Sequence, residues 1–179
     1  RMYNYDDNNN TSPWRKYSGA IENLVVEPGV TYIGNYAFYR CSSLKNAVIG
    51  EGLQSFGEYI FYQGLERIEL PSTIRLLENK LFCFLLKPLD ISFPNGCNVM
   101  NISENVFWGG NAWYNAQPDG CVYVGDVLFL YKGTMPENTT LHVREGTRVI
   151  QADFKNMTEL VDLDIPDSAD KAFFISSSL

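Results

Sequence analysis

The residue with the most obvious catalytic potential is the single histidine, His142, which lies between Leu141 and Val143. A Ser–His–Asp or Cys–His device would have to use this residue, yet the chain has no Gly-x-Ser-x-Gly or comparable nucleophile turn. The alternating apolar pattern around His142 is that of a strand, in which the histidine faces solvent. We therefore expect no catalytic residues and predict that the protein is not an enzyme.

Cysteines and aspartates are the other candidates for chemistry. The four cysteines follow no Cys-x-x-Cys or zinc-ligand spacing, and they are Cys41, Cys83, Cys97 and Cys121. Their even number would allow two disulfides, but free thiols facing the core are the simpler interpretation, with Cys41 a buried, reduced thiol. Four aspartates cluster near the C-terminal end without a calcium-loop pattern, namely Asp162, Asp164, Asp167 and Asp170. They predict a solvated acidic end, with no metal and no cofactor.

Charge narrows the class of partner. The chain has 14 Lys and Arg against 21 Asp and Glu, a net charge of −7, and no run of basic residues. Nucleic acid and anionic membrane surfaces are therefore disfavoured as partners. The longest wholly apolar run, residues 81–86, is too short to insert into a membrane. The chain opens on polar residues, so we interpret it as a fragment and expect a signal peptide upstream.

An internal repeat organises the sequence. Apolar residues recur at offsets 0, 3, 5, 9, 12, 16 and 17 from Ile21, Leu44 and Leu65, and all twenty-one of these positions are apolar. Further units are marked by Ile91, by Leu141 and, less completely, by Leu163. The spacing of 23 and then 21 residues is typical of leucine-rich repeats, which stack into solenoids.

Each unit divides into two halves. The first half alternates in and out as a short strand, which predicts parallel strands at residues 24–26, 47–49, 68–70, 91–93, 141–143 and 163–165. The second half carries apolar residues three and four apart, which predicts a short helical or 3₁₀ segment. The predicted fold class is therefore an α/β repeat solenoid, with strands on one face and helical segments on the other. A phenylalanine recurs at one place in five units and predicts a stacked ladder of Phe38, Phe61, Phe82, Phe107 and Phe154.

The repeat pattern is interrupted once, and this interruption defines the segments into which we expect the chain to divide. Residues 108–120 are predicted to be a loop, and residues 121–124 and 127–131 a hairpin with a Gly125-Asp126 turn that interrupts the repeats or lies against them. We expect a lead-in at 1–20, repeats at 21–107, the linker loop and β-hairpin at 108–138, and a further repeat with the C-terminal end at 139–179. All four segments are expected to form one solenoid domain.

Residues 28–44, Pro-Gly-Val-Thr-Tyr-Ile-Gly-Asn-Tyr-Ala-Phe-Tyr-Arg-Cys-Ser-Ser-Leu, resemble the repeat signature of BspA-like leucine-rich-repeat proteins. Residues 5–14 and 112–120 are similar to segments that precede and separate repeats in that family. The resemblance departs at Gly64, where the family has Cys, and across residues 77–89, which keep only the apolar pattern. The resemblance implies an exported or surface-attached bacterial protein that takes part in adhesion or protein–protein contact.

Two kinds of function follow from this resemblance. One is a non-catalytic exported or cell-surface module that binds a protein or glycan, or adheres to host or matrix. The other is a structural spacer or accessory domain of a larger surface protein or secreted enzyme.

The candidate binding surface is the strand face. The residue between the two core-facing positions of each strand points outward, which gives Val25, Val48, Glu69, Ser92, His142 and Asp164. Adjacent exposed valines need a reason. Either the N-terminal segment covers Val25 and Val48 with Tyr3, Tyr5 and Trp14, or the valines contact a partner. We favour the cover, which would move the partner site toward Glu69, Ser92 and His142.

Overall fold

The computed structural model describes residues 2–169, and residues 23–108 wind into coils of two or three short strands each. Two compact units are present, unit 1 at residues 1–116 and unit 2 at residues 117–179. Unit 1 contains four complete coils. A short 3₁₀ helix, Arg15–Tyr17, precedes the first coil.

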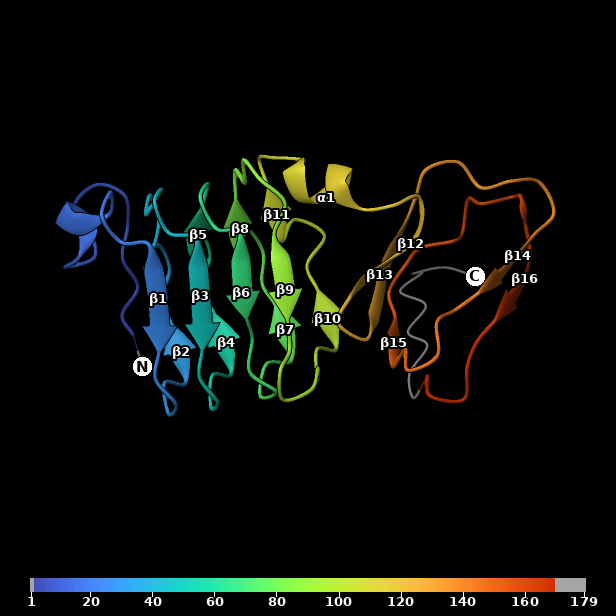
Figure 1. The fold of residues 1–179 in the computed structure, drawn as a ribbon, viewed down its shortest axis with the longest axis horizontal. Helices are drawn as coiled ribbons and strands as arrows, with labels where there is room; N and C mark the ends of the chain where they lie inside the picture. The colour runs from blue at the N-terminus through green and yellow to red at the C-terminus, as the bar shows by residue number, and fades with distance from the viewer. Residues whose placement is uncertain (1, 170–179) are drawn as a thin grey trace. The chain divides into compact units, whose positions relative to one another are not determined.

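The first face of the coils is the predicted parallel sheet. It is four-stranded, runs in sequence order and consists of β1 (Asn23–Val26), β3 (Asn46–Ile49), β6 (Arg67–Glu69) and β9 (Asp90–Ser92) (Figure 1). Its register pairs the repeat positions directly, with Val25 opposite Val48 and Ile68 opposite Ile91. The first four predicted strands are therefore confirmed as neighbours in one sheet.

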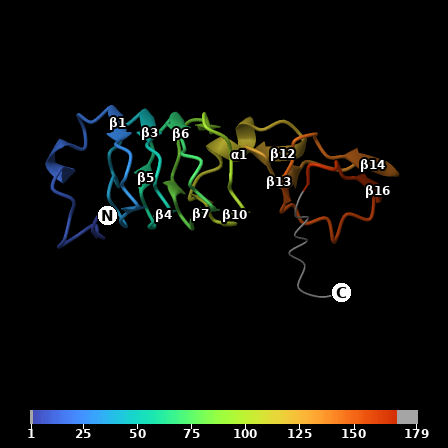
Figure 2. The same ribbon diagram turned by 90° about the horizontal axis from the view of Figure 1, so that it is seen from below.

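The second half of each coil is extended, so the predicted helical segments are wrong. A second face pairs β2 (Tyr32–Ile33) with β4 (Ser55–Phe56) and β7 (Leu76–Leu77) with β10 (Asn101–Ile102). A third face aligns β5 (Phe61–Tyr62), β8 (Phe82–Cys83) and β11 (Phe107–Trp108), and Phe38 joins it by a bridge to Phe61. Figure 2 shows β1, β3 and β6 on the side opposite β4, β7 and β10.

The backbone explains why the helical spacing was misleading. In the first three coils, the third face is flanked by two residues with positive φ between 52° and 59°. They form the pairs Tyr36 and Arg40, Tyr59 and Gln63, and Lys80 and Phe84. A right-handed helix cannot contain such left-handed residues, so the chain turns a corner at each of them. Backbone groups then bond between coils, as when Phe61 N donates to Leu81 O at 3.0 Å. Apolar residues three and four apart therefore face the core from two different sides of a coil.

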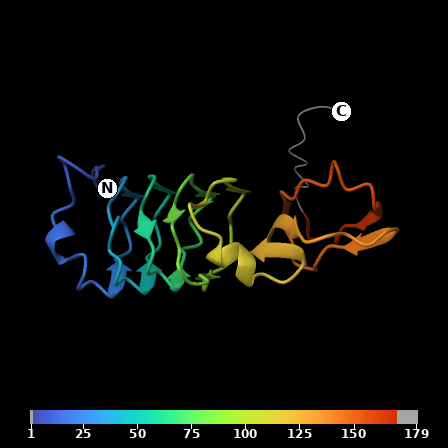
Figure 3. The same cartoon turned by 90° about the horizontal axis from the view of Figure 1, so that it is seen from above.

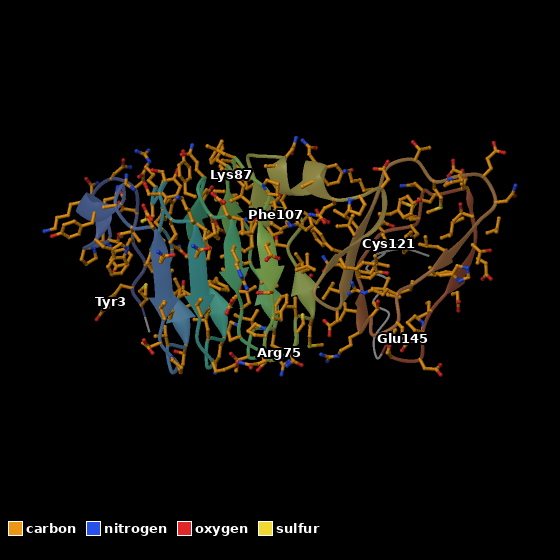
Figure 4. All side chains as sticks on the ribbon, viewed as in Figure 1. Tyr3, Arg75, Lys87, Phe107, Cys121 and Glu145 are labelled. Atoms are coloured by element: carbon orange, nitrogen blue, oxygen red, sulfur yellow. The ribbon has the colours of Figure 1, made fainter. Side chains whose placement is uncertain are left out.

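The predicted phenylalanine ladder fills the interior of unit 1. Phe38, Phe61, Phe82 and Phe107 stack with ring centroids 6.2, 5.8 and 5.4 Å apart and planes within 19° of parallel. Tryptophans extend the stack at both ends: Trp14 lies 5.4 Å from Phe38, and Trp113 lies 4.0 Å from Phe107. Figure 4 marks Phe107 among the side chains of the last coil. Phe154 is not part of this ladder, because it belongs to unit 2.

Residues 108–120 are not wholly a loop. Ala112–Ala116 form the helix α1, which buries Trp113 against Phe107 and follows the last coil (Figure 3). The helix is too short for the periodicity of the sequence to reveal it. Its tryptophan covers the apolar end that the last phenylalanine would otherwise expose.

Unit 2 contains the predicted hairpin and the last two predicted strands. β12 (Gly120–Val124) and β13 (Val127–Lys132) pair antiparallel, and β13 pairs in parallel with β15 (Val149–Ile150). β14 (Thr139–His142) lies parallel to β16 (Leu160–Asp164), with Leu141 opposite Leu163 as the repeat predicts. A small core of Leu128, Val143, Ile150 and Ala152 receives Phe154.

All four cysteines are free. Cys41 and Cys83 are buried, and the buried thiol predicted for Cys41 is confirmed, whereas Cys97 and Cys121 are only half-buried. Within residues 2–169, no helix is long and apolar enough to cross a bilayer.

Candidate functional site

The predicted strand-face residues divide between the two units. In unit 1, Val25, Val48, Glu69 and Ser92 lie side by side across the first face, in register. In unit 2, His142 and Asp164 lie opposite each other on β14 and β16, and His142 Nδ1 is 2.9 Å from Asp164 Oδ2. His142 is exposed, as predicted.

The N-terminal segment does not cover the two valines, so that expectation is wrong. Val25 is 64% exposed and Val48 is 40% exposed. Tyr5 and Trp14 instead contact each other, and Trp14 stacks on the interior ring of Phe38. Tyr5 and Trp14 lie at the open end of the ladder, where exposure of the Phe38 ring to water would be unfavourable.

The other two outward residues of the strand face in unit 1, Glu69 and Ser92, already have polar partners. Arg67 pairs with Glu69 at 3.0 Å, and Ser92 Oγ donates to Ile68 O at 3.4 Å. A binding role for this face stays a prediction. The Asp162, Asp164 and Asp167 group is exposed, and Asp170 lies outside the described residues. Within residues 2–169, no group of three or more His, Cys, Asp or Glu residues is arranged to hold a metal ion.

The third face of unit 1 carries a second, more distinctive surface. A strand alternates its side chains, so the residue after each ladder phenylalanine points outward. In the first, second and fourth coils that residue is Tyr39, Tyr62 and Trp108. Tyr36, Tyr59 and Phe84 lie at the adjacent corners. We call these six residues the aromatic face.

The six rings form one continuous cluster. Tyr36 stacks on Tyr59 at 4.8 Å, and Tyr39 contacts both Tyr59 and Tyr62. In the third coil, Cys83 occupies the position that Tyr62 and Trp108 occupy in the second and fourth coils. Phe84 contacts both Tyr62 and Trp108, and so connects the rings on the two sides of Cys83. Trp108 also contacts Tyr59 at 5.7 Å. Trp108 is 36% exposed, and the other five rings are half-buried.

Two cations lie against these rings. Lys80 Nζ is 5.1 Å from the ring centroid of Tyr59 and 5.7 Å from that of Trp108. The guanidinium of Arg40 is 5.6 Å from the ring of Tyr39 and bonds to Asp7 at 2.7 Å. Cation–π contacts of this kind hold long side chains flat against a surface.

Local electrostatics favour the neutral forms of Tyr36 and Tyr39 and the charged form of Lys80. Partial burial, reinforced by neighbouring tyrosines, raises the pKa of Tyr36, and burial likewise raises the pKa of Tyr39. A hydrogen bond to Tyr59 raises the pKa of Lys80. At neutral pH the aromatic face therefore presents hydroxyl groups, ring edges and cations, with Glu58 the nearest acid to Lys80 at 4.0 Å.

The repeat pattern alone does not predict the aromatic face, although the sequence contains a signal for it. Aromatic pairs occur at residues 38–39, 61–62 and 107–108. On a strand, one member of each pair must face the core and the other must face solvent. Because these residues were expected to be helical, that alternation was not applied to them.

Comparison with family models identifies one match. The model of the BspA type leucine-rich repeat region matches six copies across residues 16–135, a span that contains all four coils of unit 1 and the hairpin. Neither the curated proteins nor the solved structures contain a match.

Proposed function

The chain belongs to the BspA-type leucine-rich repeat family, and from this premise we propose that it is a non-catalytic, exported or cell-surface module that binds a protein partner through its aromatic face. The observation that carries the proposal is the cluster of six partly exposed rings with Arg40 and Lys80 lying over them. Adhesion to a host or matrix protein is the role that we assign to this contact.

The composition of the aromatic face favours a protein as ligand. Tyrosine, tryptophan and arginine are the residues most enriched at the energetic centres of protein interfaces. Their rings contribute a large apolar area at a small cost in conformational entropy, and their polar ends bond at the rim. In this chain the ring-to-ring contacts already fix the side chains before a partner arrives. Such preorganisation lowers the entropic cost of association.

The strand face is the weaker candidate for the same role. Its outward residues change from apolar at Val25 and Val48 to an ion pair at Arg67 and Glu69. An exposed ion pair that is already satisfied contributes little to binding. The two valines offer a small apolar area with no aromatic anchor beside it.

The experiment is a binding screen followed by matched variants. The intact chain is tested by surface plasmon resonance against a panel of purified extracellular-matrix proteins. The double variant Tyr39→Ala with Trp108→Ala should weaken binding to any matrix protein found by about thirtyfold or more, the effect of losing about 2 kcal/mol at an interface centre. The control is Glu69→Lys with His142→Ala on the predicted strand face, which should leave the affinity unchanged.

Two outcomes would contradict the proposal. If the strand-face variant loses binding while the aromatic variant does not, the partner binds on the first face. If no matrix protein binds, the alternative role as a spacer that projects another domain gains support. Urea unfolding of both variants must show that each is fully folded under the conditions of the binding measurement, so that a loss of binding is not a loss of fold.

A further inference from the structure

The turns that follow the strands of the first face lie side by side along one edge of unit 1 (Figure 1). Glu51, in the turn after β3, bonds to the turns of the next two coils. Its Oε1 accepts the backbone N–H of Ser72 at 3.0 Å, and its Oε2 accepts the Ser72 hydroxyl at 3.0 Å. Oε1 also accepts Asn95 Nδ2 at 3.0 Å, from the turn after β9. One carboxylate therefore connects the turns of three coils.

Asn95 lies in a β-turn in which the next residue has to be glycine. Gly96 N donates to Phe93 O at 3.1 Å, which closes a turn with Pro94 and Asn95 at its centre. Gly96 has a φ of 93°, a conformation that residues with a Cβ atom rarely adopt. A Cβ atom added at Gly96 would have no neighbour within 4 Å, so the backbone angle requires glycine and crowding does not.

This requirement creates the only Asn-Gly pair in the chain. Asparagine is one of the chemically labile residues of proteins. Glycine leaves its own backbone nitrogen unshielded, because it has no side chain beside that nitrogen. Asn95 is exposed, and the space around Gly96 is open. The nitrogen of Gly96 can therefore reach the side-chain Cγ of Asn95 and close a five-membered ring.

We propose that Asn95 is a site of spontaneous deamidation, which converts this asparagine to aspartate or isoaspartate and cuts the bond between the turn after β9 and Glu51. Hydroxide removes the proton from Gly96 N, which then bonds to Cγ of Asn95, and the bond from Cγ to Nδ2 breaks. Nδ2 takes a proton from water and leaves as ammonia, and a succinimide ring remains.

Water then opens the ring, and the nitrogen of Gly96 regains its proton. Attack of water at Cγ gives aspartate, and attack at the main-chain carbonyl carbon of Asn95 gives isoaspartate. The balance is one water consumed and one ammonia released. The site shares no residue with the aromatic face and does not depend on the function proposed above.

The fold controls the rate of this reaction. The Gly96 N–H must leave Phe93 O, and the Asn95 amide must leave Glu51, before the ring can close. Both bonds belong to an exposed turn, and exposed turns open at a smaller free-energy cost than core strands. Glu51 therefore slows the reaction at Asn95 without preventing it.

The product fits the turn less well than asparagine does. The side chain of Asn95 donates to Glu51, whereas an aspartate has no N–H to donate and adds a second negative charge. The backbone N–H of Ser72, followed by the Asn95 amide, lowers the pKa of Glu51, so this acid is ionised at neutral pH. Like charges at this separation repel each other. Deamidation therefore releases the turn of the fourth coil from that of the second.

The first test is site-resolved mass spectrometry of the intact chain, aged in neutral and in mildly alkaline buffer and then digested with pepsin in acid. Asn95 should be converted about tenfold or more faster than any other asparagine in residues 2–169, and faster at the higher pH. Asn95→Gln is the control and should keep its amide, because its longer side chain has to close a larger ring. An Asn95 that stays intact, or reacts no faster than the other asparagines, would overturn the proposal.

The second test changes the restraint and leaves the reacting pair alone. Glu51→Ala should accelerate the conversion of Asn95 by about fivefold, the effect of losing one hydrogen bond. Glu69→Ala removes an acid of the first face that pairs with Arg67, and it should leave the rate unchanged. The other asparagines report in the same sample whether a variant has loosened the whole fold. A Glu51→Ala rate equal to that of the parent would contradict the restraint by Glu51.

The third test measures what the modification does to the turn. Asn95→Asp reproduces one product, and Asn95→Ala removes the same hydrogen bond without adding a charge. Protection of the Gly96 amide from hydrogen exchange, measured by NMR, should fall in the alanine variant and fall further in the aspartate variant. Salt at about 1 M should bring the aspartate variant to the level of the alanine variant, because it screens the repulsion from Glu51. Parental protection in Asn95→Asp would contradict the release of the turn.

Discussion

At the scale of single residues, the ladder phenylalanines Phe61 and Phe82 are the largest fully buried side chains of unit 1. Phe61 is fully buried, with stacked neighbours at 6.2 and 5.8 Å on its two sides. Its place was predictable from the sequence, because an apolar residue recurs at one offset of the repeat. The ladder ends on Trp113 and not on Phe154. This ending was not predictable, because it depends on where the chain leaves the stacked coils.

Phe61→Ala should lower the free energy of unfolding by about 3–5 kcal/mol, because it leaves a cavity between two stacked rings. The measurement is urea denaturation followed by circular dichroism. Tyr62→Ala, at the adjacent outward position, is the matched control and should cost about 1 kcal/mol, which is the typical effect of a point substitution. A loss below about 1 kcal/mol for Phe61→Ala would show that the ring is not in the core.

The buried thiols predict a pH dependence of stability. Burial raises the pKa of Cys83 to about 12 and that of Cys41 to about 11, above the ordinary thiol value of about 8.5. A raised pKa means that the folded state retains its proton after the unfolded state has lost it. The contribution of these thiols to stability is therefore complete below about pH 8.5 and declines as the pH rises toward the folded values.

The check is the urea midpoint between pH 8 and pH 10.5, compared with that of Cys41→Ala with Cys83→Ala. The double variant starts from a lower stability but should lose less of it over this range. If parent and variant decline in parallel, the two thiols do not titrate differently in the folded and unfolded states.

At the scale of elements, the first strands of the coils were predictable and the rest of each coil was not. Residues 24–26 and 47–49 alternate cleanly between core and solvent, which only a strand explains. The second half of each coil has helical spacing, but this arises from two short strands separated by left-handed corners. Residues such as Tyr36 and Gln63 have no sequence preference for positive φ, so the corners leave no signal.

Gln63→Gly distinguishes a left-handed corner from a helix. Gln63 has a φ of 57°, a conformation that costs a side-chain-bearing residue roughly 1–2 kcal/mol and glycine nothing. The substitution should therefore leave stability unchanged or raise it by up to about 1 kcal/mol. In a helix it would lower stability by about 1 kcal/mol. Gln63→Val should destabilise the corner, and a measured gain for valine would contradict the assignment.

At the scale of the whole molecule, unit 1 has a core that is closed within itself. Trp14 and Trp113 cover the two ends of the ladder, and both belong to residues 1–116. We expect residues 1–116 to fold alone with a single cooperative thermal transition, because no ladder ring depends on unit 2. Circular dichroism melting measures this, with Trp113→Ala in the fragment as the control expected to melt earlier. A fragment without a cooperative transition would contradict the independence of the unit.

The two candidate binding surfaces, the strand face and the aromatic face, could be predicted only in part. The outward residues of the first face follow from strand alternation, and Val25, Val48, Glu69 and Ser92 lie where that rule places them. The aromatic face depends on the alignment of the third strands of successive coils. Tyr39 and Trp108 are 69 positions apart in the chain, yet they belong to one cluster because the rings of Tyr62 and Phe84 lie between them. No local pattern encodes that proximity.

Binding through the aromatic face is tested most directly by site-specific photo-crosslinking to a matrix protein that the chain binds. p-Benzoylphenylalanine is incorporated in turn at Tyr62, in the aromatic face, and at Val48, in the strand face, and each labelled protein is irradiated with the bound partner. Binding through the aromatic face should give a covalent adduct from position 62 and none from position 48. An adduct from position 48 alone would show that the partner binds the first face and would contradict the assignment of the aromatic face.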